Sequence, residues 1–210
     1  MKNTIITTPF GPRIYRSTFD ASVLDMLTTV ATEYRNNIDT MLTNGTVNGS
    51  FISLPNKTNF DIFYQELKKH VINYIELSKN AQIDYKTFSM DLVTTESMWV
   101  NFQRANDFVF LHTHETTKIS AVIYLKIPQA LQEESKQWDK KCPATPGMIE
   151  FVYGTKNDFC PGTYSFLPEE SEIVLFPSYL LHHVYPFKSA GERWSINTNI
   201  TNLNFQTVGL

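Results

Sequence analysis

The sequence predicts a mainly β protein with N-terminal helices, an α+β chain whose strands form antiparallel sheets in a sandwich or jelly-roll barrel. Two observations support this fold class. The hydrophobic pattern has a helical period up to about residue 90 and a period of two from about residue 92 onwards. Aromatic residues, which favour strands, make up 13% of the chain, including 15 Phe and 10 Tyr.

A chain of 210 residues is long enough to bury one sizeable core. We therefore expect a single domain over 1–210. Within it, residues 1–91 are expected to form a helical N-terminal support region, and residues 92–210 the β core that carries the functional site.

Two helices are expected in the support region. Asp20 is the expected N-cap of a helix over 21–42, where apolar residues recur every three or four positions. Asn59 is the expected cap of a second helix, which contains His70. We expect His70 at the surface or boundary of that helix rather than in a site.

Seven short β-prone runs follow, most of them separated by turns that contain Pro or Gly. The polar stretch 129–145 interrupts them and is expected to be a long exposed insertion, of the kind that often forms a lid. The runs are Met98–Arg104, Phe108–His114, Ile119–Ile127, Met148–Tyr153, Glu172–Phe176, His182–Phe187 and Arg193–Asn199.

Composition excludes several classes. A chain that is 42% hydrophobic and 19% charged is globular rather than disordered. A net charge of -3 gives no footprint for duplex nucleic acid, and no apolar run has the length of a membrane span or the form of a signal peptide. Cys142 and Cys160 are expected to be free thiols, which favours the cytoplasm.

Four of the five histidines form two clusters. His112 and His114 are two residues apart in a strand-like run, so both imidazoles would point to one face and could chelate one metal ion. The second cluster is His182-His183, near the end of the chain. Spacing alone does not choose between its two members.

The last predicted strand carries a candidate anion clamp. Alternation places Arg193 and Ser195 on one face, and a guanidinium can hold a carboxylate in a bidentate fork. Asn197 and Asn199 would share this face, where inward amides need hydrogen-bond partners. A histidine pair, a distal histidine and this clamp occur in the order expected of a non-haem iron(II) site.

The region from Trp99 to Asn199, about half the chain, resembles the 2-oxoglutarate- and iron(II)-dependent oxygenase family of marine phages and bacteria, relatives of the prolyl-4-hydroxylase-like enzymes. The ordered series of motifs is more specific than any one of them. The matching pieces are Trp99-Val100-Asn101, His112-x-His114, Ser120–Leu125 with Pro128, Ile149-Glu150-Phe151, Leu175–Ser178, His182-x-Val184-x-Pro186 and Arg193-x-Ser195-Ile196.

This resemblance implies a double-stranded β-helix core of the jelly-roll, cupin-like kind, with Fe(II) and 2-oxoglutarate as cofactors. The family's His-x-Val-x-Pro string selects His182 over His183. The implied metal ligands are His112, His114 and His182, and the implied co-substrate-binding residues are Arg193, Ser195, Tyr124 and Asn101.

One position departs from the wider superfamily, which has a carboxylate two residues after the first histidine, where this chain has His114. Three readings stay open. Three imidazoles could hold the metal; a bulge could let Glu115 supply a carboxylate; or a carboxylate from elsewhere could complete the site while His114 supports it.

The resemblance implies a dioxygenase that hydroxylates an unidentified peptidyl residue or small molecule and releases succinate and CO2. Its partners would be 2-oxoglutarate, dioxygen and that substrate, with neither duplex nucleic acid nor a membrane, and its compartment the cytoplasm, the host's if the gene is phage-borne. Two alternatives are a cupin-like metal enzyme that does not use 2-oxoglutarate and a non-catalytic jelly-roll binding or structural protein.

Overall fold

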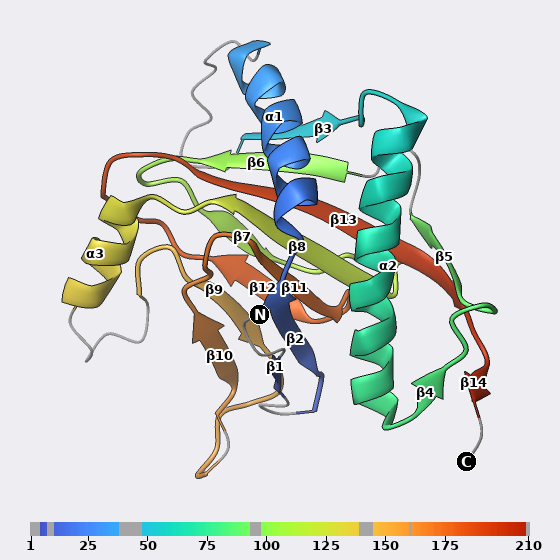
Figure 1. Cartoon of the computed structure of the whole chain (residues 1–210). Coiled ribbons are helices and arrows are strands. Elements are labelled where there is room, and N and C mark those ends of the chain that lie inside the picture. Colours follow the sequence, from blue (N-terminus) through green and yellow to red (C-terminus); the bar gives the residue numbers. More distant parts are fainter. Residues whose placement is uncertain are drawn as a thin grey trace.

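The computed structural model describes residues 5–7, 11–37, 48–92, 98–138, 145–159 and 161–208, and is drawn in Figure 1. Cys142 and Cys160 lie outside these residues. The helices are α1 (Ala21–Asn37), α2 (Lys57–Lys79) and α3 (Gln129–Gln137). The strands are β1 (Ile5–Thr7), β2 (Ile14–Thr18), β3 (Asn48–Ile52), β4 (Gln82–Ile83), β5 (Ser89–Leu92), β6 (Met98–Gln103), β7 (Val109–His112), β8 (Ile119–Lys126), β9 (Ile149–Val152), β10 (Thr163–Phe166), β11 (Glu172–Pro177), β12 (Leu181–Val184), β13 (Arg193–Asn204) and β14 (Thr207–Val208).

The strands form two main antiparallel sheets. The larger has the order β1-β2-β11-β8-β13-β6-β3, with β5 also paired to β13, and the smaller has the order β10-β9-β12-β7. A separate pair joins β14 to β4. The sheets pack face to face, as in a jelly roll, so the expected fold class of a mainly β chain with N-terminal helices is confirmed.

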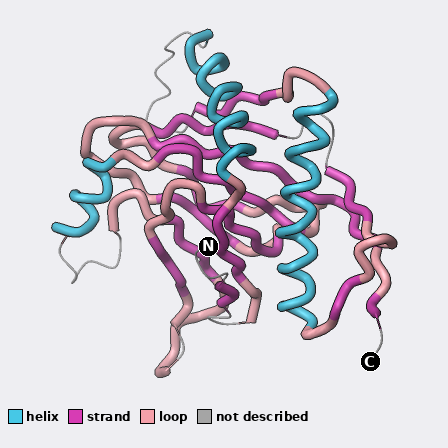
Figure 2. The backbone as a smooth tube through the Cα atoms, in the orientation of Figure 1, coloured by secondary structure: helices cyan, strands magenta, loops and turns pink. Residues whose placement is uncertain are grey.

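Helices α1 and α2 cover the outer face of the larger sheet, as the tube in Figure 2 makes visible. Their apolar faces pack on alternate residues of the central strands, such as Ile123 of β8 and Ile196 of β13. The intervening residues face the smaller sheet, where Tyr124, Phe151 and Phe176 help to form a second core. Alternation along each central strand thus separates a helix-covered core from an inner space between the sheets.

The region before residue 91 contains more than helices. Strands β1 to β5 lie there, and β2 and β3 join the larger sheet by pairing with β11 and β6. The pairing of β2 with β11 joins segments far apart in the sequence, so local periodicity does not reveal it. The division into a support region and a core stays a prediction.

Of the two expected helix N-caps, the one for α1 is confirmed and the one for α2 is wrong. Asp20 Oδ1 accepts the backbone N–H groups of Ser22 and Val23 at 2.9 and 3.2 Å, which confirms it as a cap. The cap of α2 is Asn56 rather than Asn59, because Asn56 Oδ1 accepts from the Asn59 backbone at 2.8 Å.

Two other local expectations were wrong. His70 is buried, not at the surface, with its Nδ1 3.0 Å from the Tyr15 hydroxyl and Phe19 stacked on its ring. The stretch 129–145 is not all loop, because Gln129–Gln137 form helix α3; most of its side chains are exposed or half-buried, Leu131 is fully buried, and residues 139–144 lie outside the described residues.

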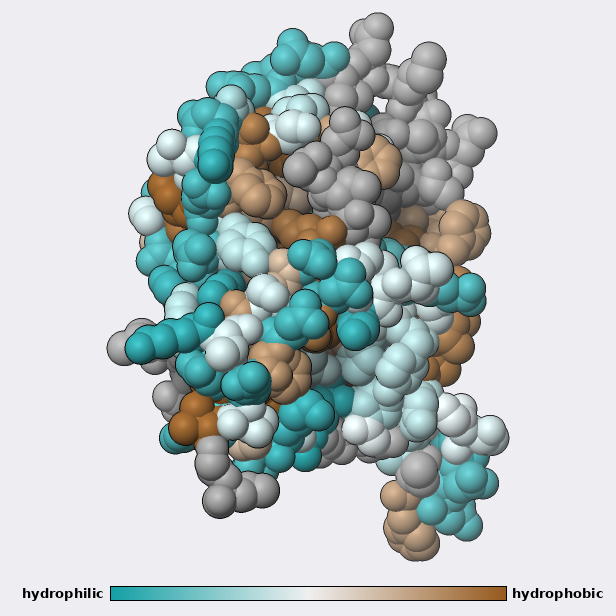
Figure 3. Space-filling view, turned by 90° about the vertical axis from the view of Figure 1, so that its right-hand side faces the viewer, coloured by the Kyte–Doolittle hydropathy of each residue, from teal (hydrophilic) through white to brown (hydrophobic). Residues whose placement is uncertain are grey.

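Among the described residues, no helix combines the length and apolarity needed to cross a bilayer. On the face that carries α2, apolar side chains are scattered among polar ones (Figure 3).

Glu192, just before β13, joins three elements. Its carboxylate accepts hydrogen bonds from Arg35 of α1 at 2.7 Å, from Arg104 after β6 at 2.9 Å, and from the Trp194 indole at 2.9 Å. These donors, Arg35 first, lower the pKa of Glu192 to about 2. The ionised carboxylate therefore fixes the start of β13 against α1 and β6.

Replacing Glu192 by Gln removes the negative charge that these donors share, and should lower the free energy of unfolding at pH 7. The expected loss is about 1–2 kcal/mol and no larger, because the carboxylate is partly exposed to water. Since its pKa is lower in the folded chain, the contribution is complete above about pH 4.5 and disappears as the pH falls towards 2. Urea unfolding at pH 7 and pH 3 should show the two proteins converging. The control is Glu33→Gln on the exposed side of α1; equal effects of both substitutions would contradict the assignment.

Candidate metal centre

A cavity of about 390 Å³ lies between the two sheets. Its wall is formed by side chains from β6, β7, β8, β9, β12 and β13, by Phe108 and His114 on either side of β7, and by Gly49 of β3. The predicted histidine pair, the distal histidine and the Arg193 clamp all line this cavity. The long-range pairing of β7 with β12 and of β13 with β6 and β8 brings them together.

Three histidines cluster in this cavity. The ligand atoms of His112, His114 and His182 all lie within 4.8 Å of one another. His112 ends β7 and His182 lies opposite it on β12, at the paired register position, with ring centroids 4.2 Å apart. The set is of a size and chemistry that suits one transition-metal ion.

Backbone hydrogen bonds orient two of these rings. Nδ1 of His112 lies 2.7 Å from the Phe110 carbonyl oxygen, and Nδ1 of His182 lies 2.8 Å from the Leu180 carbonyl oxygen. A carbonyl can only accept, so both Nδ1 atoms carry the proton. Each Nε2 atom then keeps a free lone pair, and a nitrogen in this form can bind a metal.

His114 lies beyond the strand, contrary to the expected run to residue 114, because β7 ends at His112. The loop that carries it is held by the turn between β11 and β12. The His114 N–H donates to the Ser178 carbonyl at 2.9 Å, and the Ser178 N–H donates to the Lys118 carbonyl at 3.1 Å. This clamp, not strand alternation, aims His114 at the cavity.

The cluster favours neutral imidazoles. Burial, and then the neighbouring His112, lowers the pKa of His182 to about 3 and that of His114 to about 4. Both rings are therefore uncharged at neutral pH, each with one ring nitrogen that carries a proton and one that has a lone pair.

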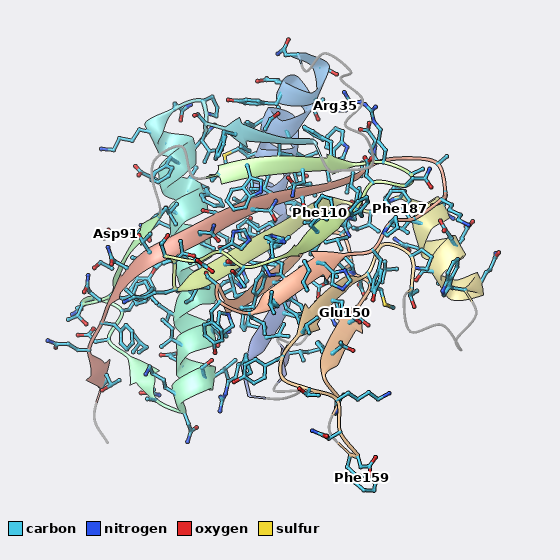
Figure 4. All side chains as sticks on the ribbon, turned by 180° about the vertical axis from the view of Figure 1, so that it is seen from behind. Arg35, Asp91, Phe110, Glu150, Phe159 and Phe187 are labelled. Atoms are coloured by element: carbon cyan, nitrogen blue, oxygen red, sulfur yellow. The ribbon has the colours of Figure 1, made fainter. Side chains whose placement is uncertain are left out.

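His183 points away from the cluster. Its Nε2 lies 3.1 Å from Glu150 Oε1, which also accepts from the Tyr185 hydroxyl at 2.8 Å. Alternation on β12 places His182 inside and His183 on the outer face of the smaller sheet. Glu150 is the labelled residue on β9 in Figure 4.

No carboxylate lies in the cavity wall formed by the described residues. Glu115 is exposed and is not part of the histidine cluster. Of the three readings of the third ligand, the geometry therefore supports the set of three imidazoles.

The four expected co-substrate residues also line the cavity: Arg193, Ser195, Tyr124 and Asn101. They come from three neighbouring strands, because Ser195 of β13 pairs with Tyr124 of β8 and with Asn101 of β6. Burial raises the pKa of the Tyr124 phenol to about 12, so its hydroxyl keeps a proton to donate.

Arg193 is a buried cation without an acidic partner among the described residues. Only 4% of its surface is exposed. One guanidinium nitrogen donates to the Gly147 carbonyl at 2.8 Å, the Tyr124 ring lies 5.7 Å away, and Nε has no hydrogen-bond partner. A buried, unpaired charge is costly, so an anion in the cavity would stabilise this arginine.

Sequence reasoning missed Gly147 and an aromatic rim, defined as Trp99, Phe108 and Phe110. The Phe108 and Phe110 rings meet edge to face at 4.7 Å, and Phe110, labelled in Figure 4, is 63% exposed. All three residues line the cavity. Their aromatic character was visible in the sequence, but the pairing of distant strands that brings them to one cavity was not.

Replacing Gly147 by Ala should destabilise the chain more than Gly154→Ala does. Both glycines have positive φ, 70° and 73°, but a Cβ at 147 would lie 2.8 Å from Leu131, whereas a Cβ at 154 meets nothing. Overpacking should add about 1–3 kcal/mol to the free energy difference measured by urea unfolding. Equal costs at the two positions would contradict the close packing of α3 against the loop that holds Arg193.

Replacing His182 by Gln should remove most of the affinity for Fe(II), measured by anaerobic titration, because a lone pair is lost from the cluster. Replacing His183 by Gln makes the same chemical change at the next residue, on the opposite face, and should leave the affinity within about threefold. Comparable losses for both variants would contradict the assignment of His182 to the inner face.

A comparison with protein families finds one match: a family described as "Putative 2OG-Fe(II) oxygenase", over residues 97–199. No curated protein matches the sequence. These comparisons confirm the expected resemblance to prolyl-4-hydroxylase-like oxygenases, and they do not test a phage or marine origin.

Solved structures share the fold at low sequence identity. A Pseudomonas putida prolyl-4-hydroxylase aligns with a TM-score of 0.53 and 13% identity, covering 93% of each chain. A Trichoplax adhaerens prolyl hydroxylase, in complex with a hypoxia inducible factor peptide fragment, gives 0.53 and 14%, covering 89% of this chain and 82% of its own. HygX from Streptomyces hygroscopicus, with nickel and 2-oxoglutarate bound, gives 0.54 and 10%, covering 89% and 81%.

Proposed function

On the premise that the chain belongs, through residues 97–199, to the 2OG-Fe(II) oxygenase family, we propose that it is a dioxygenase that hydroxylates a peptidyl residue or a small molecule. The family makes the chain an enzyme that depends on 2-oxoglutarate and iron(II). The non-catalytic alternative is thereby set aside. The proposal concerns the reaction, hydroxylation, and the class of substrate.

The observation that carries the proposal is the presence of two complementary sites in one cavity. His112, His114 and His182 offer three imidazole nitrogens as ligands, and Arg193 offers an unpaired positive charge. Iron(II) suits the first site, since imidazole is one of its preferred ligands. A dicarboxylate suits both, because one end can reach a metal while the other neutralises the arginine.

When bound, iron(II) and 2-oxoglutarate would supply the oxidation, in which dioxygen converts the co-substrate to succinate and CO2 and a substrate C–H group to C–OH. The three imidazoles would hold the metal at one face and leave its other positions to ligands from the cavity.

The protein's remaining contribution is orientation and exclusion of water. The Gly147 carbonyl fixes one side of the Arg193 guanidinium, which leaves the Nε side to face a carboxylate. The Ser195 and Tyr124 hydroxyls, on paired strands, can donate to the same carboxylate. Apolar side chains such as Val109 and Val184 line the same cavity and lower its polarity, which strengthens these contacts.

The aromatic rim is suited to contact an extended or planar substrate that enters past Trp99, Phe108 and Phe110. Arg193 is the lone Lys, Arg, Asp or Glu side chain in the described cavity wall, and the proposal assigns it to the co-substrate. We therefore assign the rim to a neutral part of a peptide or metabolite. The expected compartment remains the cytoplasm, in line with the cysteine usage of the sequence.

Replacing Arg193 by Leu should weaken 2-oxoglutarate binding at least about 30-fold, because a buried charge pair is lost. The three imidazoles are untouched, so Fe(II) affinity should stay within about threefold. Anaerobic calorimetry measures both, first with Fe(II) alone and then with 2-oxoglutarate added. Retained metal binding with unchanged 2-oxoglutarate binding would favour a cupin-like enzyme that does not use this co-substrate.

A further inference from the structure

The third imidazole of the cluster is held differently from the other two. Nδ1 of His114 lies 3.2 Å from the side-chain amide of Asn199 on β13. A carbonyl oxygen can only accept a hydrogen bond, so it fixes the proton on the imidazole nitrogen that faces it. An amide can either donate from Nδ2 or accept at Oδ1, so the contact with Asn199 allows both neutral forms of the His114 ring.

We propose that Asn199 is a positioning residue that controls which nitrogen of His114 carries the proton, and so decides whether His114 can serve as the third metal ligand. The inference rests on the proposed function, in that it takes the three-imidazole site as given. It adds a residue outside the ligand set that acts through His114.

The hydrogen bonds around Asn199 set the starting state. Asn199 Oδ1 accepts from the Ser120 hydroxyl at 2.8 Å, so the amide nitrogen faces Nδ1 of His114. If Nδ2 donates to Nδ1, the ring proton lies on Nε2. In that state Nε2 has no free lone pair, and His114 cannot bind a metal through it.

A half-turn of the amide reverses this state without breaking any contact. Oδ1 then accepts the proton of His114 Nδ1, and Nδ2 donates to the Ser120 hydroxyl oxygen. Ser120 in turn can donate to the Ser178 hydroxyl, which lies 2.9 Å away. Because hydroxyls donate and accept equally well, the chain Asn199–Ser120–Ser178 supports both directions.

This chain is shielded from water. The exposed fractions are 7% for Asn199, 2% for Ser120 and 0% for Ser178. Bulk water therefore has little access to replace the amide as the partner of Nδ1. Ser178 also holds the His114 backbone through its carbonyl, so ring and backbone of the third ligand depend on the same small network.

Replacing Asn199 by Leu removes the partner of Nδ1 at similar size, and should weaken Fe(II) binding about 10- to 100-fold in anaerobic titrations. Replacing Asn199 by Asp keeps an acceptor that can only stabilise the Nδ1-protonated ring, and should bind Fe(II) at least as tightly as the wild type. Asn197→Leu is the matched control. It lies two residues earlier on the same face and donates to the Trp99 carbonyl instead.

The state of the ring can be read directly by ¹⁵N NMR of histidine-labelled protein, metal-free and loaded with Zn(II). In the wild type we expect the His114 proton to move from Nε2 to Nδ1 on Zn(II) binding. In Asn199→Asp it should lie on Nδ1 in both states. A wild-type ring protonated on Nδ1 without metal would overturn the proposal, as would Asn199→Leu with Fe(II) affinity equal to that of Asn197→Leu.

His114→Ala separates this inference from the proposed function. If His114→Ala binds Fe(II) as tightly as the wild type, the three-imidazole site itself is wrong. If His114→Ala loses affinity and Asn199→Leu does not, only the role of Asn199 is wrong. Melting curves of the metal-free variants show whether a substitution destabilises the fold. If Asn199→Leu does so, the test rests on Asn199→Asp, in which ¹⁵N NMR reports the protonated nitrogen of His114.

Discussion

The alternation of side chains along β13 is the constraint on which the rest of the structure depends. Ile196 and Ile200 face the helix-covered core, whereas Arg193 and Asn199 face the cavity. A slip of one residue would bury the polar set under the helices and place the apolar set beside the histidines. Pairing with β6 and β8 on both sides prevents that slip, and the Glu192 hub fixes where the strand begins.

The ligands that the cavity can bind depend on which charged side chains its wall contains and which it lacks. The described wall holds three imidazoles, one arginine and no carboxylate, and burial keeps His114 and His182 uncharged. A metal ion bound there would retain its full positive charge among the protein ligands, which favours anionic partners from solution. Arg193 adds to that preference. The site is thus electrostatically incomplete until a dianion of suitable length joins both ends.

The sequence predicted those parts that depend on local rules. Period-two alternation identified β13 and its inward residues, and the series of motifs identified the histidines and Arg193. It did not predict how β2 and β3 complete the larger sheet, since register between distant strands leaves little local trace. The position of His114 was predicted for the wrong reason, because a loop clamp by Ser178, not a strand, aims its ring. Gly147 was missed because its role is a carbonyl and a close contact with Leu131, neither of which residue type reveals.

The most direct test of the central claim is an anaerobic crystal structure with Fe(II) and 2-oxoglutarate bound. We expect one metal ion bonded to the Nε2 atoms of His112, His114 and His182, with the far carboxylate of 2-oxoglutarate at the Nε side of Arg193. A protein carboxylate bonded to the metal, or 2-oxoglutarate bound away from Arg193, would contradict the account.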